Sequence, residues 1–135
     1  MTKQRFLSGL LLSGLLFTAA TCGRPPTRAV PPEIFGRWFH SFEEETPGTN
    51  VYRPESFGFP LARGRTGFAL YEDGRFEQYD IAPTDGLETT PGTWESPEKN
   101  TVRVQLNGVR EGRPASFQFQ IVSVEKNRLI LRREQ

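Results

Sequence analysis

The side chains that most often carry chemistry are scarce in this sequence, which contains one histidine and one cysteine among 135 residues. A single histidine, His40, forms neither a catalytic triad nor a zinc site without further partners. The sequence also lacks a Gly-x-Ser-x-Gly motif, a Cys-x-x-Cys pair, a phosphate-binding glycine loop and a histidine-rich run. We therefore predict a protein that is not an enzyme, has no catalytic residues and uses no cofactor.

Glu43, Glu44 and Glu45 form the densest group of possible metal ligands. Calcium prefers carboxylate oxygens, but its sites need ligands that converge from several chain positions. Adjacent carboxylates mostly project into water, so we expect no metal site here.

Residues 1–21 are typical of an export signal. Lys3 and Arg5 precede an apolar run at 6–17, and small residues follow at 18–21. The apolar run is shorter than the about 20 residues of a comfortable membrane span. Cys22 comes directly afterwards and, as the only cysteine, has no partner for an internal disulfide.

Cys22 at this spacing resembles the lipidation site of bacterial lipoproteins, in which the new N-terminal cysteine is acylated. Two or three acyl chains suffice for stable attachment, at ~0.8 kcal/mol per buried methylene. The resemblance implies a lipid-anchored protein of the cell envelope, and Gly23 implies the outer membrane, with the protein facing the periplasm. Thr21 stands where that signal has Gly or Ala. Cleavage after Ala20 would instead release a secreted soluble protein, and an uncleaved signal is the third alternative.

Residues 22–33 contain four prolines and form an expected tether. Proline-rich segments stay extended and bury little surface. Removal of Lys3 and Arg5 with the signal leaves 15 basic residues against 16 acidic ones, a balance that gives no support to nucleic-acid binding. We expect the tether to hold a folded domain, at 34–135, off a membrane.

Short alternating segments separated by turn residues predict that this domain is all-β. The 11 phenylalanines and 13 glycines suit pleated, turn-rich structure. About eight strands close into a small antiparallel up-and-down barrel, just wide enough to fill with side chains or to hold one small ligand. The expected strands span 36–43, 50–53, 66–72, 75–81, 92–95, 101–106, 115–124 and 128–133.

The first expected strand organises the barrel. Gly36 leaves room for a tight entry into the strand. Trp38, His40 and Phe42 alternate with their neighbours and should share the interior face. His40 therefore either points into a cavity or is a core histidine satisfied by a neighbour.

Two local patterns make further structural predictions. Asp73-Gly74 predicts a hairpin with a type I′ turn, in which both central residues have positive φ. Val122 and Val124 break the alternation of the strand at 115–124, which predicts a bulge or a buried edge.

Two Gly-x-Trp motifs and an arginine pair stand at the ends of expected strands: Gly36-x-Trp38, Gly92-x-Trp94 and Arg132-Arg133. Together with the segment at 71–76, they resemble lipocalins and the short lipocalin-like domains of bacterial lipoproteins. The resemblance implies that an arginine of the last strand lies over the first-strand tryptophan, a contact worth about 0.5–2 kcal/mol. It also implies a barrel that holds a small molecule. Avidin-like barrels open on the same motif.

The connection at 44–65 is longer than strand connections usually are. It contains Phe57, Phe59 and Arg65, and either seals one barrel end as a packed flap or gates a ligand or partner. Together with His40 and Tyr71, these residues are the candidate ligand-binding set.

Two functions fit these features. The first is a membrane-tethered carrier of a small apolar or amphipathic molecule. The second is an interaction module without a cavity, such as an envelope assembly factor or a hydrolase inhibitor, that binds an envelope protein through its loops. The interior volume separates the two, since ligand pockets usually occupy ~300–1,000 Å³.

Overall fold

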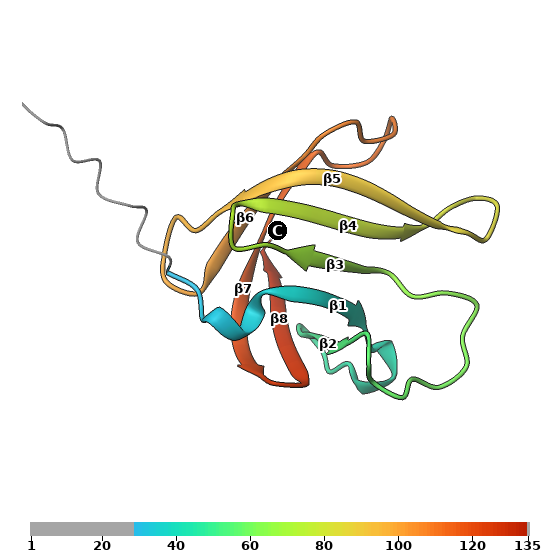
Figure 1. The fold of residues 1–135 in the computed structure, drawn as a ribbon, viewed down its shortest axis with the longest axis horizontal. Helices are drawn as coiled ribbons and strands as arrows, with labels where there is room; N and C mark the ends of the chain where they lie inside the picture. The colour runs from blue at the N-terminus through green and yellow to red at the C-terminus, as the bar shows by residue number, and fades with distance from the viewer. Residues whose placement is uncertain (1–28, 135) are drawn as a thin grey trace, which may run out of the picture.

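The computed structural model describes residues 29–134, which form a closed barrel of eight antiparallel strands (Figure 1). The prediction of an all-β fold with about eight antiparallel strands is therefore confirmed. Within these residues no helix has the length and apolar character needed to cross a membrane. The elements are the 3-10 segments η1 (Pro32–Ile34) and η2 (Phe42–Glu44) and the strands β1 (Gly36–His40), β2 (Asn50–Pro54), β3 (Gly67–Leu70), β4 (Arg75–Ile81), β5 (Leu87–Glu95), β6 (Thr101–Leu106), β7 (Ser116–Glu125) and β8 (Arg128–Glu134).

The strands follow one another around the ring in chain order, except that the first two are exchanged. The ring runs β2, β1, β3, β4, β5, β6, β7, β8 and back to β2. β1 thus lies between β2 and β3 and pairs antiparallel with both. Because β2 and β3 run in the same direction, the chain must cross from one to the other past β1. Residues 55–66 make this connection, and we call them the crossover segment.

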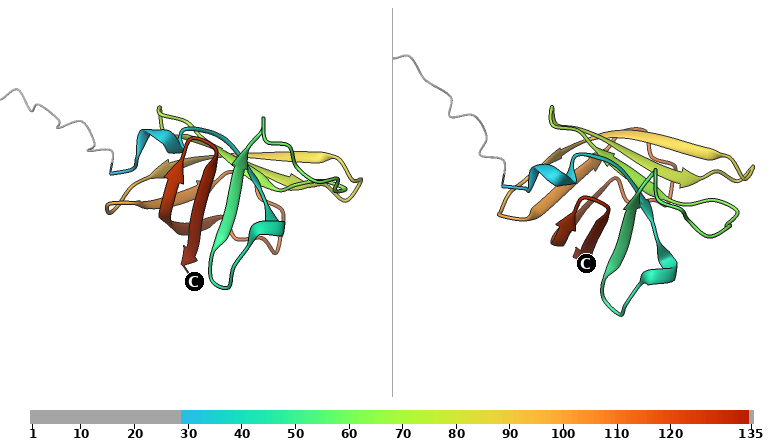
Figure 2. Two further views of the ribbon diagram at one scale, coloured as in Figure 1. Left: turned by 90° about the horizontal axis from the view of Figure 1, so that it is seen from below. Right: turned by 60° about the horizontal axis from the view of Figure 1, so that its bottom comes forward.

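The two ends of the barrel differ. At one end of the barrel, which we call the mouth, β1, β4 and β8 end while β2 and β3 begin. At the opposite, sealed end, Val30 and Ile34 are buried in the core. The indole of Trp38 donates to the carbonyl of Ile34 at 2.8 Å, and the backbone of Asn100 donates to the carbonyl of Ala29 at 2.7 Å. The described chain therefore enters at the sealed end (Figures 1 and 2).

These contacts bear on the expected tether at 22–33. Its first part lies outside the described residues, but residues 29–33 pack against the barrel rather than standing away from it. Val30 contributes to the same core as the strands. Folded contacts thus begin a few residues before the expected domain start at 34.

Inward-facing apolar side chains fill the sealed half of the barrel. Phe68 stacks on Phe76 and tilts against Phe119, with ring centroids 5.6 Å apart in both pairs. β6 alternates as a two-residue period requires, because Val102, Val104 and Leu106 are buried while the residues between them are exposed. The remaining core residues include Trp38, Leu70, Ile121, Leu129 and Leu131.

β1 is shorter than expected, and this changes the position of Phe42. The strand ends at His40, and the chain turns at Ser41 into η2. The Ser41 hydroxyl is buried and donates to the Glu44 carboxylate at 2.8 Å, which favours the turn over further extension. The prediction that Phe42 lies inside the barrel is wrong, since 48% of its surface is exposed.

Two further local predictions have different outcomes. The hairpin at Asp73-Gly74 is confirmed, but the type I′ turn is wrong: Gly74 has φ 95°, whereas Asp73 does not have positive φ. A single left-handed glycine after ordinary turn residues is the pattern of a three-residue loop. The bulge in β7 is confirmed by a register shift between Ile121 and Ser123, which leaves Val122 exposed.

β5 begins five residues earlier than expected, in spite of Pro91. From Leu87 to Pro91 the strand pairs with β4, and pairing with β6 begins only at Gly92. Pro91 thus stands at the end of the β5–β6 ladder, where its carbonyl accepts from the backbone of Asn107 at 2.8 Å, and proline is tolerated at the margin of a sheet.

Gly92 is required by the close approach of β5 and β6. A Cβ at this position would lie 2.4 Å from the carbonyl oxygen of Gln105. We expect Gly92→Ala to lower the free energy of unfolding by about 1–3 kcal/mol, as overpacking does, measured by urea denaturation. The matched control is Gly86→Ala, where an added Cβ meets no atom within 4 Å; equal effects of the two substitutions would contradict this role.

Candidate functional site

The mouth of the barrel leads into a cavity of about 290 Å³. Its floor consists of the buried side chains of Phe68, Phe76, Phe119 and Leu131, which close it toward the sealed half. Half-buried Tyr52 and Phe117 form part of its wall. The core of aromatic side chains thus stops short of the mouth and leaves a space with an apolar floor.

The rim of this cavity is polar. Asn50, Gln78, Asp80 and Arg133 line it, and each comes from a different position around the mouth or along β4. The amide of Gln78 donates to Asp80 at 3.1 Å, and Asp80 also forms an ion pair of 2.9 Å with Arg113. The negative charge of Asp80 is therefore compensated at the rim.

A second cavity of about 280 Å³ adjoins the first and shares Gln78, Asp80, Phe117 and Arg133 with it. Its other walls come from β5 and from the β6–β7 connection, including Val109 and Pro114. Arg110 and Glu88 form an ion pair across it. The shared residues make the two spaces neighbouring parts of one recess.

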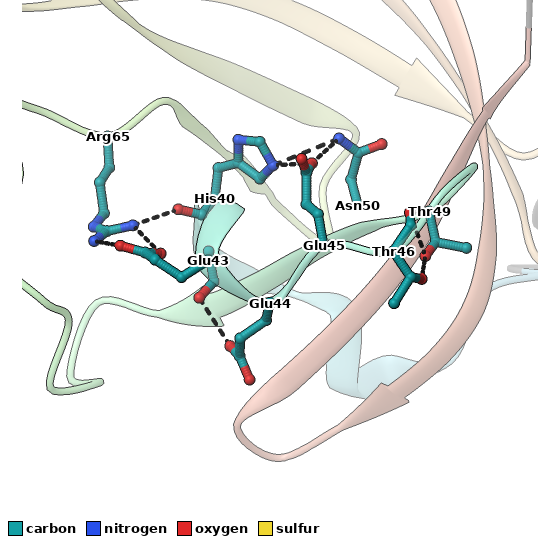
Figure 3. Close-up of polar contacts among 9 residues, drawn as sticks. His40, Glu43, Glu44, Glu45, Thr46, Thr49, Asn50 and Arg65 are labelled. Carbon is teal, nitrogen blue, oxygen red and sulfur yellow. Dashed lines mark hydrogen bonds and ion pairs between the residues drawn. The ribbon is translucent and has the colours of Figure 1, made fainter.

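His40 lies at the corner between β1 and β2, where it pairs with Tyr52, and it does not line the main cavity. Its Nε2 is 2.5 Å from a carboxylate oxygen of Glu45, which also accepts from the amide of Asn50 at 2.6 Å (Figure 3). The imidazole stacks on Tyr52 with centroids 5.2 Å apart. His40 thus supports two cavity-lining residues, Asn50 and Tyr52, and has its own partners.

Arg65 holds the crossover segment to η2. Its guanidinium donates to both carboxylate oxygens of Glu43, at 2.9 and 2.5 Å, and to the His40 carbonyl at 3.1 Å (Figure 3). It also lies over the rings of Phe42 and Phe59, at 4.7 and 4.4 Å from their centroids. These contacts explain why Phe42, although exposed, keeps a fixed place.

The other crossover candidate, Phe57, is similarly engaged. It packs edge-on against Phe59 at 5.0 Å and lies under the guanidinium of Arg53 at 4.6 Å. Phe57, Phe59 and Arg65 do not line the main cavity. The structure thus brings these three predicted ligand-binding residues together with one another, in a packed flap beside the mouth.

Tyr71, the remaining candidate, lies far from the mouth, at the hairpin between β3 and β4. Its hydroxyl donates to Glu77 at 3.1 Å, and its carbonyl accepts from the indole of Trp94 at 2.8 Å. The same carboxylate accepts from Tyr79 at 2.6 Å. Tyr71 therefore fixes the sealed-end hairpin, and it does not reach the cavity.

The arginine pair and the first-strand tryptophan are not brought together. Arg133 lies over Phe117, 5.0 Å from its centroid, whereas Trp38 bonds to Ile34 at the sealed end. The reason is the ring order. β1 and β8 both pair antiparallel with β2, so they run in the same direction and the end of β8 reaches the mouth. Arg132 faces outward and is exposed.

The three consecutive glutamates form ion pairs with three different residues. Glu43 pairs with Arg65, Glu44 with Arg53, and Glu45 with His40. Within residues 29–134, no group of three or more histidine, cysteine, aspartate or glutamate side chains is placed to hold a metal ion.

The export signal and Cys22 lie outside the described residues. Comparison with known proteins finds no matching family model, no matching curated protein and no matching solved structure. The chain is thus defined by its fold, a small closed antiparallel barrel with a recess at one end.

Several cavity residues were missed by sequence reasoning, notably Asn50, Tyr52, Gln78 and Asp80. A signal for two of them was present. Gln78 and Asp80 alternate with Phe76 along β4, so the period that places Phe76 inside also turns them inward. Nothing local identified Asn50 and Tyr52, which face the cavity only because β2 lies between β1 and β8.

The ion pair of Glu44 makes the corner beside the mouth sensitive to acid. Hydrogen bonds from Arg53, and a further one from Ser41, hold the pKa of Glu44 at about 2, against its ordinary 4.5. A carboxyl with a lowered pKa stabilises the fold above its unfolded-state pKa and loses this effect as the pH falls through the folded-state value. The loss therefore falls between about pH 4.5 and 2.

Wild type should be more stable than Glu44→Gln above about pH 4.5, and we expect this difference in unfolding free energy to shrink as the pH falls from about 4.5 to 2. Urea denaturation at a series of pH values measures it. Glu111→Gln is the control, because Glu111 is exposed and has no ion pair within residues 29–134. A difference that stays constant with pH for Glu44→Gln would contradict the assignment.

Proposed function

We propose that this protein is an exported, lipid-anchored barrel of the cell envelope that binds a small apolar or amphipathic molecule, and that it is not an enzyme. The observation that supports the proposal best is the recess at the mouth. Its main part, about 290 Å³, is close to the lower limit of ~300 Å³ for ligand pockets, and the adjoining part enlarges it. Its apolar floor and polar rim suit an amphipathic ligand.

The position of the chain entry supports a tethered binding protein. Residues 29–33 join the barrel at its sealed end, opposite the mouth (Figure 2). A chain anchored through Cys22 would hold that end toward the membrane, so the mouth would face the periplasm. This arrangement gives a dissolved ligand free access to the recess. Lipocalin-like barrels offer a functional analogy, since they too hold one small molecule inside a closed sheet.

An interaction module is the second candidate, and it has an observation of its own. Leu61 of the crossover segment, with Ile81 and Leu87 at the β4–β5 hairpin, are exposed apolar residues, and both segments project beyond the mouth (Figures 1 and 2). Exposed apolar groups often mark contact sites. The partner would then be another envelope protein.

Ligand binding is tested by narrowing the mouth. Thr66 is exposed and lines the cavity, so Thr66→Trp should obstruct entry without disturbing the core. Native mass spectrometry of the protein purified from membranes should show a co-purifying small molecule in wild type and its loss in the variant. Affinity for the neutral probe naphthamide should fall by about tenfold or more, equivalent to ~1.4 kcal/mol.

The matched control is Val122→Trp, which adds the same ring at the exposed β7 bulge, outside the cavity. It should behave as wild type. An empty wild-type protein that also binds no probe would refute the carrier function and favour the interaction module.

The anchor is tested at Cys22. Cys22→Ala should move the protein from the membrane fraction to the soluble fraction and remove incorporation of a labelled fatty acid, because acylation needs the cysteine. Thr21→Gly, which improves the match to the lipoprotein signal, should keep both. Continued detergent dependence of Cys22→Ala would contradict a lipid anchor.

A further inference from the structure

We propose that the ligand of the mouth cavity is a small organic acid, whose carboxylate is held by the guanidinium of Arg133 and the hydroxyl of Tyr52 while its apolar part rests on the aromatic floor. This inference rests on the proposed function and specifies the ligand class.

Arg133 is placed to meet a ligand. It belongs to the inward face of β8, on which Leu129 and Leu131 precede it, and it is the Cα partner of Phe119 on β7. Its guanidinium lies over Phe117. It lines both parts of the recess, so the cation stands directly above the apolar floor.

Among the three arginines that line the recess, Arg133 is the one without an ion pair to another described residue. Arg113 pairs with Asp80, and Arg110 pairs with Glu88. Within residues 29–134, the guanidinium of Arg133 has no ion pair and no hydrogen bond; its contact is with the ring of Phe117.

The nearby acid Glu45 is already engaged by His40 and Asn50. Glu45 is outside the lining of the recess, which contains three arginines against Asp80 and Glu88 and so keeps one positive charge in excess. The charge of Arg133 is accessible from the mouth.

Tyr52 supplies a second donor. Its ring is fixed between His40 and Phe68, at 5.2 Å from each centroid, and its hydroxyl has no hydrogen-bond partner within the described part of the chain. Burial raises the pKa of Tyr52 to about 12, although the charge of Arg133 opposes this rise. The phenol thus keeps its proton at neutral pH, and its O–H can donate a hydrogen bond to an anion.

A carboxylate matches this pair of donors. Its two oxygens accept from the fork of a guanidinium in a geometry that a neutral amide or alcohol cannot reproduce. An apolar cavity of about 150 Å³ is sufficient for benzene, so the larger recess has room for one or two rings or a short chain. A macromolecular anion does not fit this volume.

The test compares two probes of the same shape. Naphthoate and naphthamide differ in charge, and their binding is measured by calorimetry on the full-length protein in nanodiscs, with empty nanodiscs as the blank. We expect naphthoate to bind about tenfold or more tightly than naphthamide, as charge-assisted hydrogen bonds allow.

Three variants test which side chains cause the preference for naphthoate. Arg133→Gln should remove the preference for naphthoate, and Tyr52→Phe should weaken naphthoate binding several-fold. Arg132→Gln removes the same charge from the outward face of the same strand and should leave the preference intact.

The outcomes separate the two proposals. If naphthamide binds as well as naphthoate in wild type, or if Arg133→Gln keeps the preference, the carboxylate assignment is wrong while the carrier function stands. If neither probe binds and Thr66→Trp changes nothing, both fail together.

Discussion

The position of β2 between β1 and β8 is the constraint on which the rest of this structure depends. It forces β1 and β8 to run in the same direction, so the last strand ends at the mouth. It also leaves β2 and β3 on either side of β1, which requires the crossover segment at 55–66. A barrel in strict chain order would have placed the end of β8 beside the start of β1 and would have needed only a short β2–β3 turn.

The polar contacts at the corner of β1 and β2 follow from that constraint. The crossover segment and η2 meet there, and Arg65 joins them through Glu43 and two aromatic rings. Glu44 and Glu45 fix the same corner to Arg53 and to His40. These bonds hold η2 and the crossover segment in place beside the mouth, and through Glu45 they also hold the cavity-lining side chain of Asn50.

The two ends of the barrel differ in how they are closed. Residues 29–34 close one end with apolar contacts and complete the core around Trp38. The other end keeps an aromatic floor but carries polar and charged groups, including Arg133. The apolar closure and the recess thus lie at opposite ends of the same sheet.

The sequence by itself determined the features that depend on local period and local turns. Alternation located the eight strands, and its break at Val122 indicated the bulge, because a strand repeats every two residues whatever its neighbours are. The same alternation along β4 places Gln78 and Asp80 on the inward face with Phe76, although neither was predicted as a site residue.

The tertiary structure alone decided the ring order, and with it the site. Which strands become neighbours is a matter of long-range pairing that no local pattern encodes, so the separation of Arg133 from Trp38 and the inward position of Tyr52 could not be predicted. The roles of Arg65, Phe57 and Phe59 were decided in the same way, because their partners lie on segments that only the closed ring brings together.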